Sequence, residues 1–175
     1  WDYRGLYRSG KPPDPDALTM EDHCADLEAV LKAEKVNKAI FIGWSMGVQL
    51  NFEYYRRNPG QFAGLIQING AFARPMETIM GTHRLAGFTP QTVGFLRHVM
   101  PRLQFLVPLA TKKGRLVHAM KRTGFLAPSL DESIFQDLSS DFLNLDFDIY
   151  GKIFRHLAQH DATDVLGSIS CPVLL

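Results

Sequence analysis

Apolar residues in the first seventy positions switch between helical spacing and short unbroken runs. Four segments follow this pattern in turn: a helix over 20–35, a strand over 39–42, a helix over 46–57 and a strand over 64–68. Thr19 stands before the first helix as an N-cap, with Asp22 three residues further on. Unbroken apolar runs of this length are typical of strands buried on both faces of a parallel sheet. The order of the segments therefore predicts an α/β fold with a mainly parallel sheet.

The pattern changes after residue 70. Residues 71–146 contain no convincing strand, but several helical pieces rich in Phe, Leu and Met, interrupted at Pro90, Pro101, Pro108 and Pro128. A further helix is expected over 148–159, and the apolar run 171–175 resumes the sheet. We therefore predict a core over residues 1–70, an inserted helical lid over 71–146, and a return to the core over 147–175.

The central motif is Gly43-Trp44-Ser45-Met46-Gly47, which follows a predicted strand and opens a predicted helix. A serine in G-x-S-x-G lies on a sharp, strained strand-to-helix turn that projects its hydroxyl above the sheet. Strand and helix close up around that turn, so only very small side chains fit at the positions of Gly43 and Gly47. We predict that Ser45 is a nucleophile and that the backbone N–H of Met46 donates to the oxyanion of a tetrahedral intermediate.

Two further segments extend this pattern. Residues 2–9, Asp-Tyr-Arg-Gly-Leu-Tyr-Arg-Ser, resemble the D-x-R-G-x-G-x-S loop of the α/β-hydrolase family, except at Tyr7, where a second glycine is usual. Residues 161–175 are similar to the family's approach to the strand before its catalytic acid. The resemblance implies a partial α/β-hydrolase core that contains the nucleophile elbow, with an inserted helical lid.

In that family the chain order is nucleophile, acid, histidine. The resemblance implies that the acid and the histidine follow Leu175 and that a second oxyanion donor precedes Trp1. Some members carry the acid after the sixth strand, but this chain has Asn69-Gly70 there, which offers no carboxylate. The chain opens without a methionine and closes on an apolar run, so we expect a fragment that is inactive alone.

The resemblance implies a hydrolase of carboxylic esters or lactones with a hydrophobic small-molecule substrate and no cofactor. Three alternatives stay open. The same serine would serve a carbon–carbon bond hydrolase or a thioesterase, it would also serve an acyltransferase, and a binding protein could keep the fold without the triad. Dehalogenases and epoxide hydrolases of this fold use an aspartate where this chain has Ser45.

The overall composition limits the classes of binding partner that this chain could have. The 19 Lys and Arg nearly balance the 18 Asp and Glu, which argues against nucleic acid or an anionic membrane surface as the main partner. No apolar run is long enough to span a bilayer. Cys24 and Cys171 suit neither a disulfide framework nor a metal site, and are expected to be small core residues in a reducing compartment, which favours the cytoplasm. Oligomeric state cannot be inferred from the sequence.

Other polar residues have structural interpretations. His156 and His160 share helical spacing, but they lack a third ligand, so we expect a helix-surface pair and no metal site. We expect His23, His83, His98 and His118 in the lid or on the surface, and Asp2 and Arg4 paired within their loop. The basic residues Lys112, Lys113, Arg115, Lys121 and Arg122 predict a solvated lid face.

Large apolar side chains have two possible roles. Trp44 could lie in the core or line the pocket, although the elbow turns it away from Ser45. Most of the lid's aromatic and methionine side chains should pack on the core, and a minority should face an apolar substrate. They are Phe72, Met76, Met80, Phe88, Phe95, Met100, Phe105, Met120 and Phe125.

Overall fold

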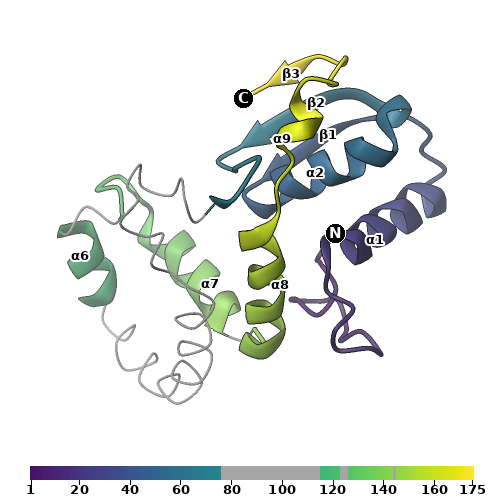
Figure 1. The fold of residues 1–175 in the computed structure, drawn as a ribbon. Coiled ribbons are helices and arrows are strands. Elements are labelled where there is room, and N and C mark those ends of the chain that lie inside the picture. The colour runs from purple at the N-terminus through teal and green to yellow at the C-terminus, as the bar shows by residue number, and fades with distance from the viewer. Residues whose placement is uncertain (76–114, 123–125, 144) are drawn as a thin grey trace.

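The computed structural model describes residues 1–75, 115–122, 126–143 and 145–175 (Figure 1). Its elements, in chain order, are α1 (Met20–Ala33), β1 (Ala39–Trp44), α2 (Met46–Arg57), the 3₁₀ turn η1 (Pro59–Gln61), β2 (Phe62–Ile68), α6 (Arg115–Arg122), α7 (Glu132–Leu143), α8 (Phe147–Gln159), α9 (Thr163–Leu166) and β3 (Val173–Leu174). The expected sequence of helices and strands in the first seventy residues is confirmed.

The three strands form one parallel sheet in the order β1-β2-β3. Strand β2 starts two residues earlier than expected, at Phe62, which pairs with Ala39 of β1. The final apolar run contributes only Val173 and Leu174 as a strand. The α/β class and the parallel sheet inferred from the sequence are both confirmed.

Helix α1 begins as predicted and ends slightly early. The Thr19 side chain accepts from the backbone N–H of Asp22, and the Asp22 carboxylate accepts from that of Thr19, which completes a capping box. The helix ends at Ala33 rather than Lys35, because Lys35 has a φ of +57° and cannot continue a right-handed helix.

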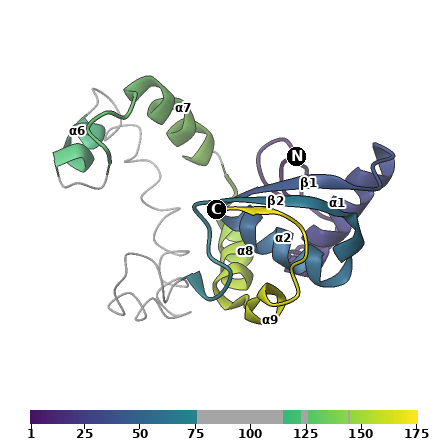
Figure 2. The ribbon, with the colours of Figure 1, turned by 90° about the horizontal axis from the view of Figure 1, so that it is seen from above.

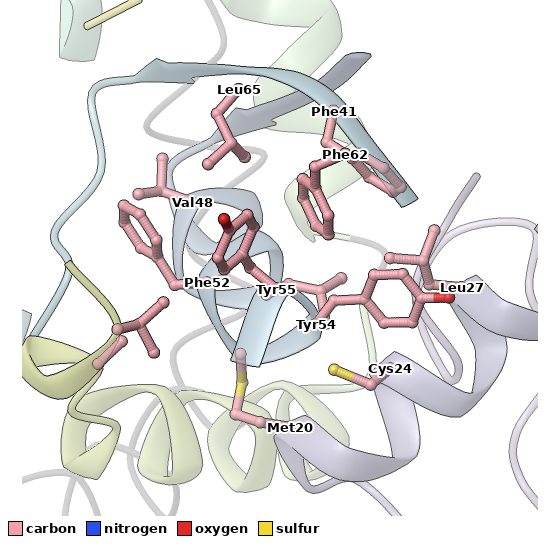
Figure 3. Close-up of a cluster of buried hydrophobic side chains, with 13 residues drawn as sticks. Met20, Cys24, Leu27, Phe41, Val48, Phe52, Tyr54, Tyr55, Phe62 and Leu65 are labelled. Carbon is pink, nitrogen blue, oxygen red and sulfur yellow. The ribbon is translucent and has the colours of Figure 1, made fainter. Parts of the chain in front are cut away.

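The main core lies between one face of the sheet and helices α1 and α2. Figure 3 shows Phe41, Phe62 and Leu65 of the strands directed toward Val48, Phe52 and Tyr55 of α2, with Met20, Cys24 and Leu27 of α1 on the far side. Cys24 is buried and Cys171 packs against this cluster, and both are free thiols. The expectation that both cysteines are small core residues is confirmed for Cys24 and holds in part for Cys171.

The opposite face of the sheet is exposed. Ile40, Ile42 and Trp44 of β1 are 60, 65 and 68% exposed, and Ile68 and Leu174 of the neighbouring strands are exposed on the sheet as well. Seen from above, β1 and β2 lie in front of α1 and α2 (Figure 2). Trp44 was expected in the core or lining a pocket, and instead it lies on this uncovered apolar face, because alternate residues of a strand point to opposite faces.

A second cluster joins the N-terminal loop to α8. Leu6 and Leu18 of the loop pack against Ile149 and Ile153 of α8, and Leu145 completes the buried set. Tyr3 and Met46 contact the same cluster, so the loop, α8 and the start of α2 form one packing unit.

One expectation for the N-terminal loop is wrong. Arg4 does not pair with Asp2: its guanidinium donates to both carboxylate oxygens of Asp26, at 2.6 and 2.5 Å, and to the backbone oxygen of Asp22. Asp2 instead accepts from the backbone N–H of Arg8. Tyr7 has a φ of +47°, so it adopts the left-handed backbone conformation for which the family uses glycine.

Much of the expected lid lies outside the described residues. Within 115–143 the structure describes helices α6 and α7, in agreement with the helical character expected there. Lys121 is not a free cation of a solvated face, since it contacts the Glu132 carboxylate and donates to the backbone oxygen of Leu130. Phe72 is half exposed. Arg122 is exposed, as expected of a solvated face. The remaining aromatic and methionine residues of the expected lid lie outside the described residues, as do His83, His98, Pro90, Pro101, Pro108, Lys112 and Lys113, and the side chains of Arg115 and Met120 are not described either.

Candidate active site

A single residue, Ser45, separates the end of β1 from the start of α2. Its backbone angles are φ 53° and ψ −115°, in a region that non-glycine residues seldom occupy. The residue is exposed, and its side chain makes no capping hydrogen bond to α2. Strained backbone of this kind is concentrated at functional sites. The structure therefore presents the Ser45 hydroxyl on a sharp strand-to-helix turn, with its oxygen free of the helix.

The turn closes so tightly that Gly43 cannot carry a side chain. A β-carbon there would lie 2.6 Å from the carbonyl carbon and oxygen of Gly47 and 2.6 Å from the side-chain oxygen of Gln67. Gln67 is buried in β2, and its oxygen accepts from the Asn51 side chain of α2 at 3.2 Å. The side-chain nitrogen of Gln67 has no hydrogen-bond partner among the described residues. Gln67 and Asn51 thus brace strand and helix directly beneath the elbow.

Residues at the end of β2 and just after it also contact the turn at Ser45. The backbone N–H of Ser45 donates to the carbonyl oxygen of Ile68 at 3.0 Å. After the strand, a β-carbon on Gly70 would lie 2.3 Å from Cγ2 of Val48 and 2.6 Å from the Ser45 carbonyl oxygen. Sequence reasoning missed Gln67, Ile68 and Gly70 as elbow supports. A polar residue inside an apolar strand run, followed by Asn-Gly, was the available signal.

Met46 is the first residue of α2, so its N–H has no acceptor within the helix. The backbone N–H of Val48 already donates to the Ser45 carbonyl oxygen at 3.1 Å. The helix dipole adds positive potential at this end. An N–H in this position is suited to stabilise an oxyanion formed next to Ser45.

Behind the elbow, Tyr3 and His23 pack ring against ring. The Tyr3 hydroxyl lies 3.3 Å from the point that a β-carbon on Gly47 would occupy, and burial raises the pKa of Tyr3 to about 12. His23 makes an edge contact with Tyr3 at 5.2 Å between ring centroids. It was expected in the lid or on the surface, and this was wrong, because it lies on the buried face of α1. Neither nitrogen of the His23 ring has a hydrogen-bond partner in the part of the chain that the structure describes, and burial lowers the pKa of His23 to about 4.

The other described histidines lie elsewhere. His118 is exposed on α6, and His156 is half-buried on α8. His160 was expected on a helix surface with His156, but its side chain is only 6% exposed and contacts Glu53. None of these rings hydrogen-bonds to Ser45. Over the described ranges, no three His, Cys, Asp or Glu side chains converge as metal ligands would.

An open cavity of about 750 Å³ lies between the N-terminal loop and the end of α7. Arg8, Lys11, Asp141 and Asp146 contribute charged groups to its wall. Lys11 contacts the Asp146 carboxylate at 2.6 Å and holds the pKa of that carboxyl below its ordinary value. Ser45 is not part of the lining, so this cavity is separate from the elbow. Among the helices that the structure describes, none is both long and apolar enough to cross a membrane.

Comparison with known proteins supports the same fold. A sequence profile described as "alpha/beta hydrolase fold" matches residues 1–151. A search of curated proteins gave no significant match.

Solved structures with the same architecture include a thermophilic esterase from Thermogutta terrifontis, with 21% identity and a TM-score of 0.64, of which this chain covers 57%. An esterase from Exiguobacterium antarcticum has 18% identity and a TM-score of 0.64, with 59% of its chain covered. The enol-lactonase from Burkholderia xenovorans LB400 has 18% identity and a TM-score of 0.67, with 58% covered. In each comparison 98% of this chain is aligned, so the chain spans less than three fifths of these proteins. The profile match, the parallel sheet and the strand-to-helix turn at Ser45 together place this chain in the α/β hydrolase fold family.

Proposed function

We propose that this chain carries the nucleophile of a hydrolase that cleaves carboxylic esters or lactones of hydrophobic small molecules. The observation that carries the proposal is the strained, exposed backbone of Ser45 at the single-residue junction of β1 and α2. The esterases and the lactonase with the same architecture support this substrate class.

In the proposed reaction the Ser45 oxygen attacks the carbonyl carbon while its proton passes to a histidine base. The resulting oxyanion is stabilised by the Met46 N–H at the start of α2. Collapse of this intermediate expels the alcohol, which takes the proton from the histidine, and leaves an acyl group on Ser45. Water then attacks the acyl-enzyme by the same route and releases the acid. The chain's own residues require no cofactor for these steps.

We further propose that the base, the acid and a second oxyanion donor come from polypeptide outside this chain. Three observations support this. No described histidine makes a hydrogen bond to Ser45, and the chain spans less than three fifths of the aligned esterases. The apolar sheet face at Ile40, Ile42 and Trp44 is a third, since parallel sheets are ordinarily covered on both faces. The division into a core over 1–70 and 147–175 and a lid over 71–146 belongs to the same proposal.

A fluorophosphonate probe tests the nucleophile directly in a protein that contains this chain and the remainder of the domain. We expect covalent labelling at Ser45, and loss of both labelling and ester turnover by several powers of ten in Ser45→Ala. Ser133→Ala, which removes an exposed serine of α7, is the matched control and should retain both. Labelling at another serine, or activity that survives Ser45→Ala, would exclude the proposed role.

Substrate profiling then separates the open alternatives. A series of p-nitrophenyl esters and lactones of increasing acyl length should show rising kcat/KM, as an apolar pocket requires. Added alcohols or thiols would reveal an acyltransferase through new ester or thioester products. A folded protein that binds these compounds without turnover or labelling would be a binding protein that has kept the fold.

A further inference from the structure

Helix α2 carries three buried polar side chains, where a helix packed into a core usually carries apolar ones, and two of them, Gln49 and Glu53, lie one turn apart. These two contact the end of α8 and the residue that follows it. The side chains of Glu53 and His160 are 4 and 6% exposed, and they contact each other at 3.1 Å between Oε2 and Nε2. Buried polar groups of this kind need partners, and their hydrogen bonds fix their arrangement.

The hydrogen bonds around Gln49 determine the protonation of the His160 ring. The Gln49 side-chain nitrogen donates to the carbonyl oxygen of Leu157 at 3.1 Å, which fixes the orientation of the amide. The same nitrogen lies 3.3 Å from Nδ1 of His160. Since an amide nitrogen only donates, Nδ1 must accept and carry no proton. The ring proton then lies on Nε2, from which it is donated to Glu53.

Neighbouring groups keep the Glu53 carboxyl ionised, so that it can accept the hydrogen bond from Nε2–H of His160. The hydrogen bond from His160, followed by the nearby guanidinium groups of Arg56 and Arg57, holds the pKa of the Glu53 carboxyl below its ordinary value. Arg56 contacts the Glu53 carboxylate directly and also donates to the Asp161 backbone oxygen at 3.0 Å. The carboxylate is therefore ionised and paired from three directions.

His160 also lies where the chain leaves the core and returns to it. The backbone N–H of Arg74 donates to the His160 carbonyl oxygen at 2.9 Å, and that of Ala162 donates to Phe72 at 2.9 Å. Ala73 and Asp161 form an antiparallel bridge between these contacts. His160 thus contacts the outgoing segment, the end of α8 and helix α2, which follows Ser45 directly.

We propose that His160 is a positioning residue, which holds α2 and the Ser45 elbow in place through its Nε2–H tautomer between Gln49 and Glu53. The role in turnover rests on the proposed function of Ser45. The tautomer itself does not, and it can be measured without any substrate.

The first experiment is ¹⁵N NMR of the histidine side chains at neutral pH, with the His160 signals assigned by their loss in His160→Gln. We expect a protonated Nε2 and an unprotonated Nδ1. The Gln49→Leu variant removes the donor to Nδ1 but leaves the Glu53 acceptor at Nε2, so we expect the Nδ1 resonance to shift while the proton stays on Nε2. A doubly protonated ring or an Nδ1–H tautomer in the unmodified protein, or an unchanged Nδ1 resonance in Gln49→Leu, would overturn the proposal.

The second experiment compares variants in the complete, labelling-competent protein. His160→Leu should lower kcat and the rate of fluorophosphonate labelling by about tenfold to a hundredfold with little change in KM, because a misplaced nucleophile affects the chemical step. His160→Gln, which can still donate to Glu53, should recover most of that loss. His118→Gln, at an exposed histidine of α6, is the control and should behave as the unmodified protein.

Equal losses in His160→Gln and His160→Leu would show that the ring only fills space, and unchanged kcat in both would show that it positions nothing. Failure of the proposed function gives a different result. In that case Ser45 would not label in the unmodified protein, while the NMR experiment would still report the tautomer.

Discussion

The side-chain oxygen of Gln67 lies 2.6 Å from the point that a β-carbon on Gly43 would occupy. Two neighbours therefore exclude a side chain at position 43: the backbone of Gly47 in α2 and the side chain of Gln67 in β2. The second requirement is specific to a chain with a buried polar residue at position 67, and it leads to the first two predictions.

Gly43→Ala should destabilise the protein by about 3 kcal/mol, because the added methyl group meets backbone that cannot move aside without opening the turn. Urea unfolding measures this. Gly151→Ala in α8 is the matched control, since nothing lies within 4 Å of its added β-carbon, and it should stabilise the protein by up to about 1 kcal/mol. Similar unfolding midpoints for the two variants would contradict the tight elbow.

Gln67→Leu should cost about 2 kcal/mol, since it leaves the buried Asn51 amide without its partner. Combining it with Asn51→Leu should cost much less than the sum of the two single changes, as both ends of the hydrogen bond are then removed. A double-mutant cycle by urea unfolding gives the coupling. Strict additivity would show that the two amides do not support each other.

His23 makes the stability of the fold sensitive to acid. Burial lowers the pKa of His23 from 6.5 to about 4. Between these two pH values the unfolded chain therefore binds a proton at His23 that the folded protein does not bind. Stability present above pH 6.5 should be lost as the pH falls toward 4, by about 3 kcal/mol from this group. In His23→Met, unfolding measured between pH 7.5 and 4.5 should show this much less pH dependence. An unchanged slope would mean that His23 is not the group responsible.

Arg4 should not be replaceable by lysine. Its guanidinium contacts both oxygens of Asp26 while donating to the backbone oxygens of Ala17 and Asp22, a set that a single ammonium group cannot reproduce. We expect Arg4→Lys to cost about 1 to 2 kcal/mol in thermal or urea unfolding. Arg8→Lys, at an exposed guanidinium of the same loop, should be neutral, and an equal loss in both variants would refute the argument.

Local features were predictable from the sequence. The Thr19 capping box, the buried run 39–42 and the glycine-flanked serine each depend on residues within a few positions of one another, so their spacing carries the information. The elbow at Ser45 follows from one strand, one turn and one helix in succession. The sequence therefore located the nucleophile candidate and the parallel order of the sheet.

Partners far apart in the chain were not predictable. Arg4 was expected to pair with Asp2, its near neighbour, but it reaches Asp26 because α1 folds back along the loop. His160 was assigned to a surface from helical spacing, yet that helix ends at Gln159, and the ring turns inward to meet Glu53. Spacing within a segment cannot show which distant segment will cover it.

The antiparallel bridge between Ala73 and Asp161 brings the two ends of the intervening chain together at one point. Because those ends are adjacent, residues 76–144 should tolerate changes of length or sequence with little effect on the strands, as long as α8 keeps its place in the core. Such an arrangement lets evolution, or a protein engineer, alter this segment while the elbow itself is retained. Retention of His160 and of its contacts with α2 would be the condition for such grafts to succeed.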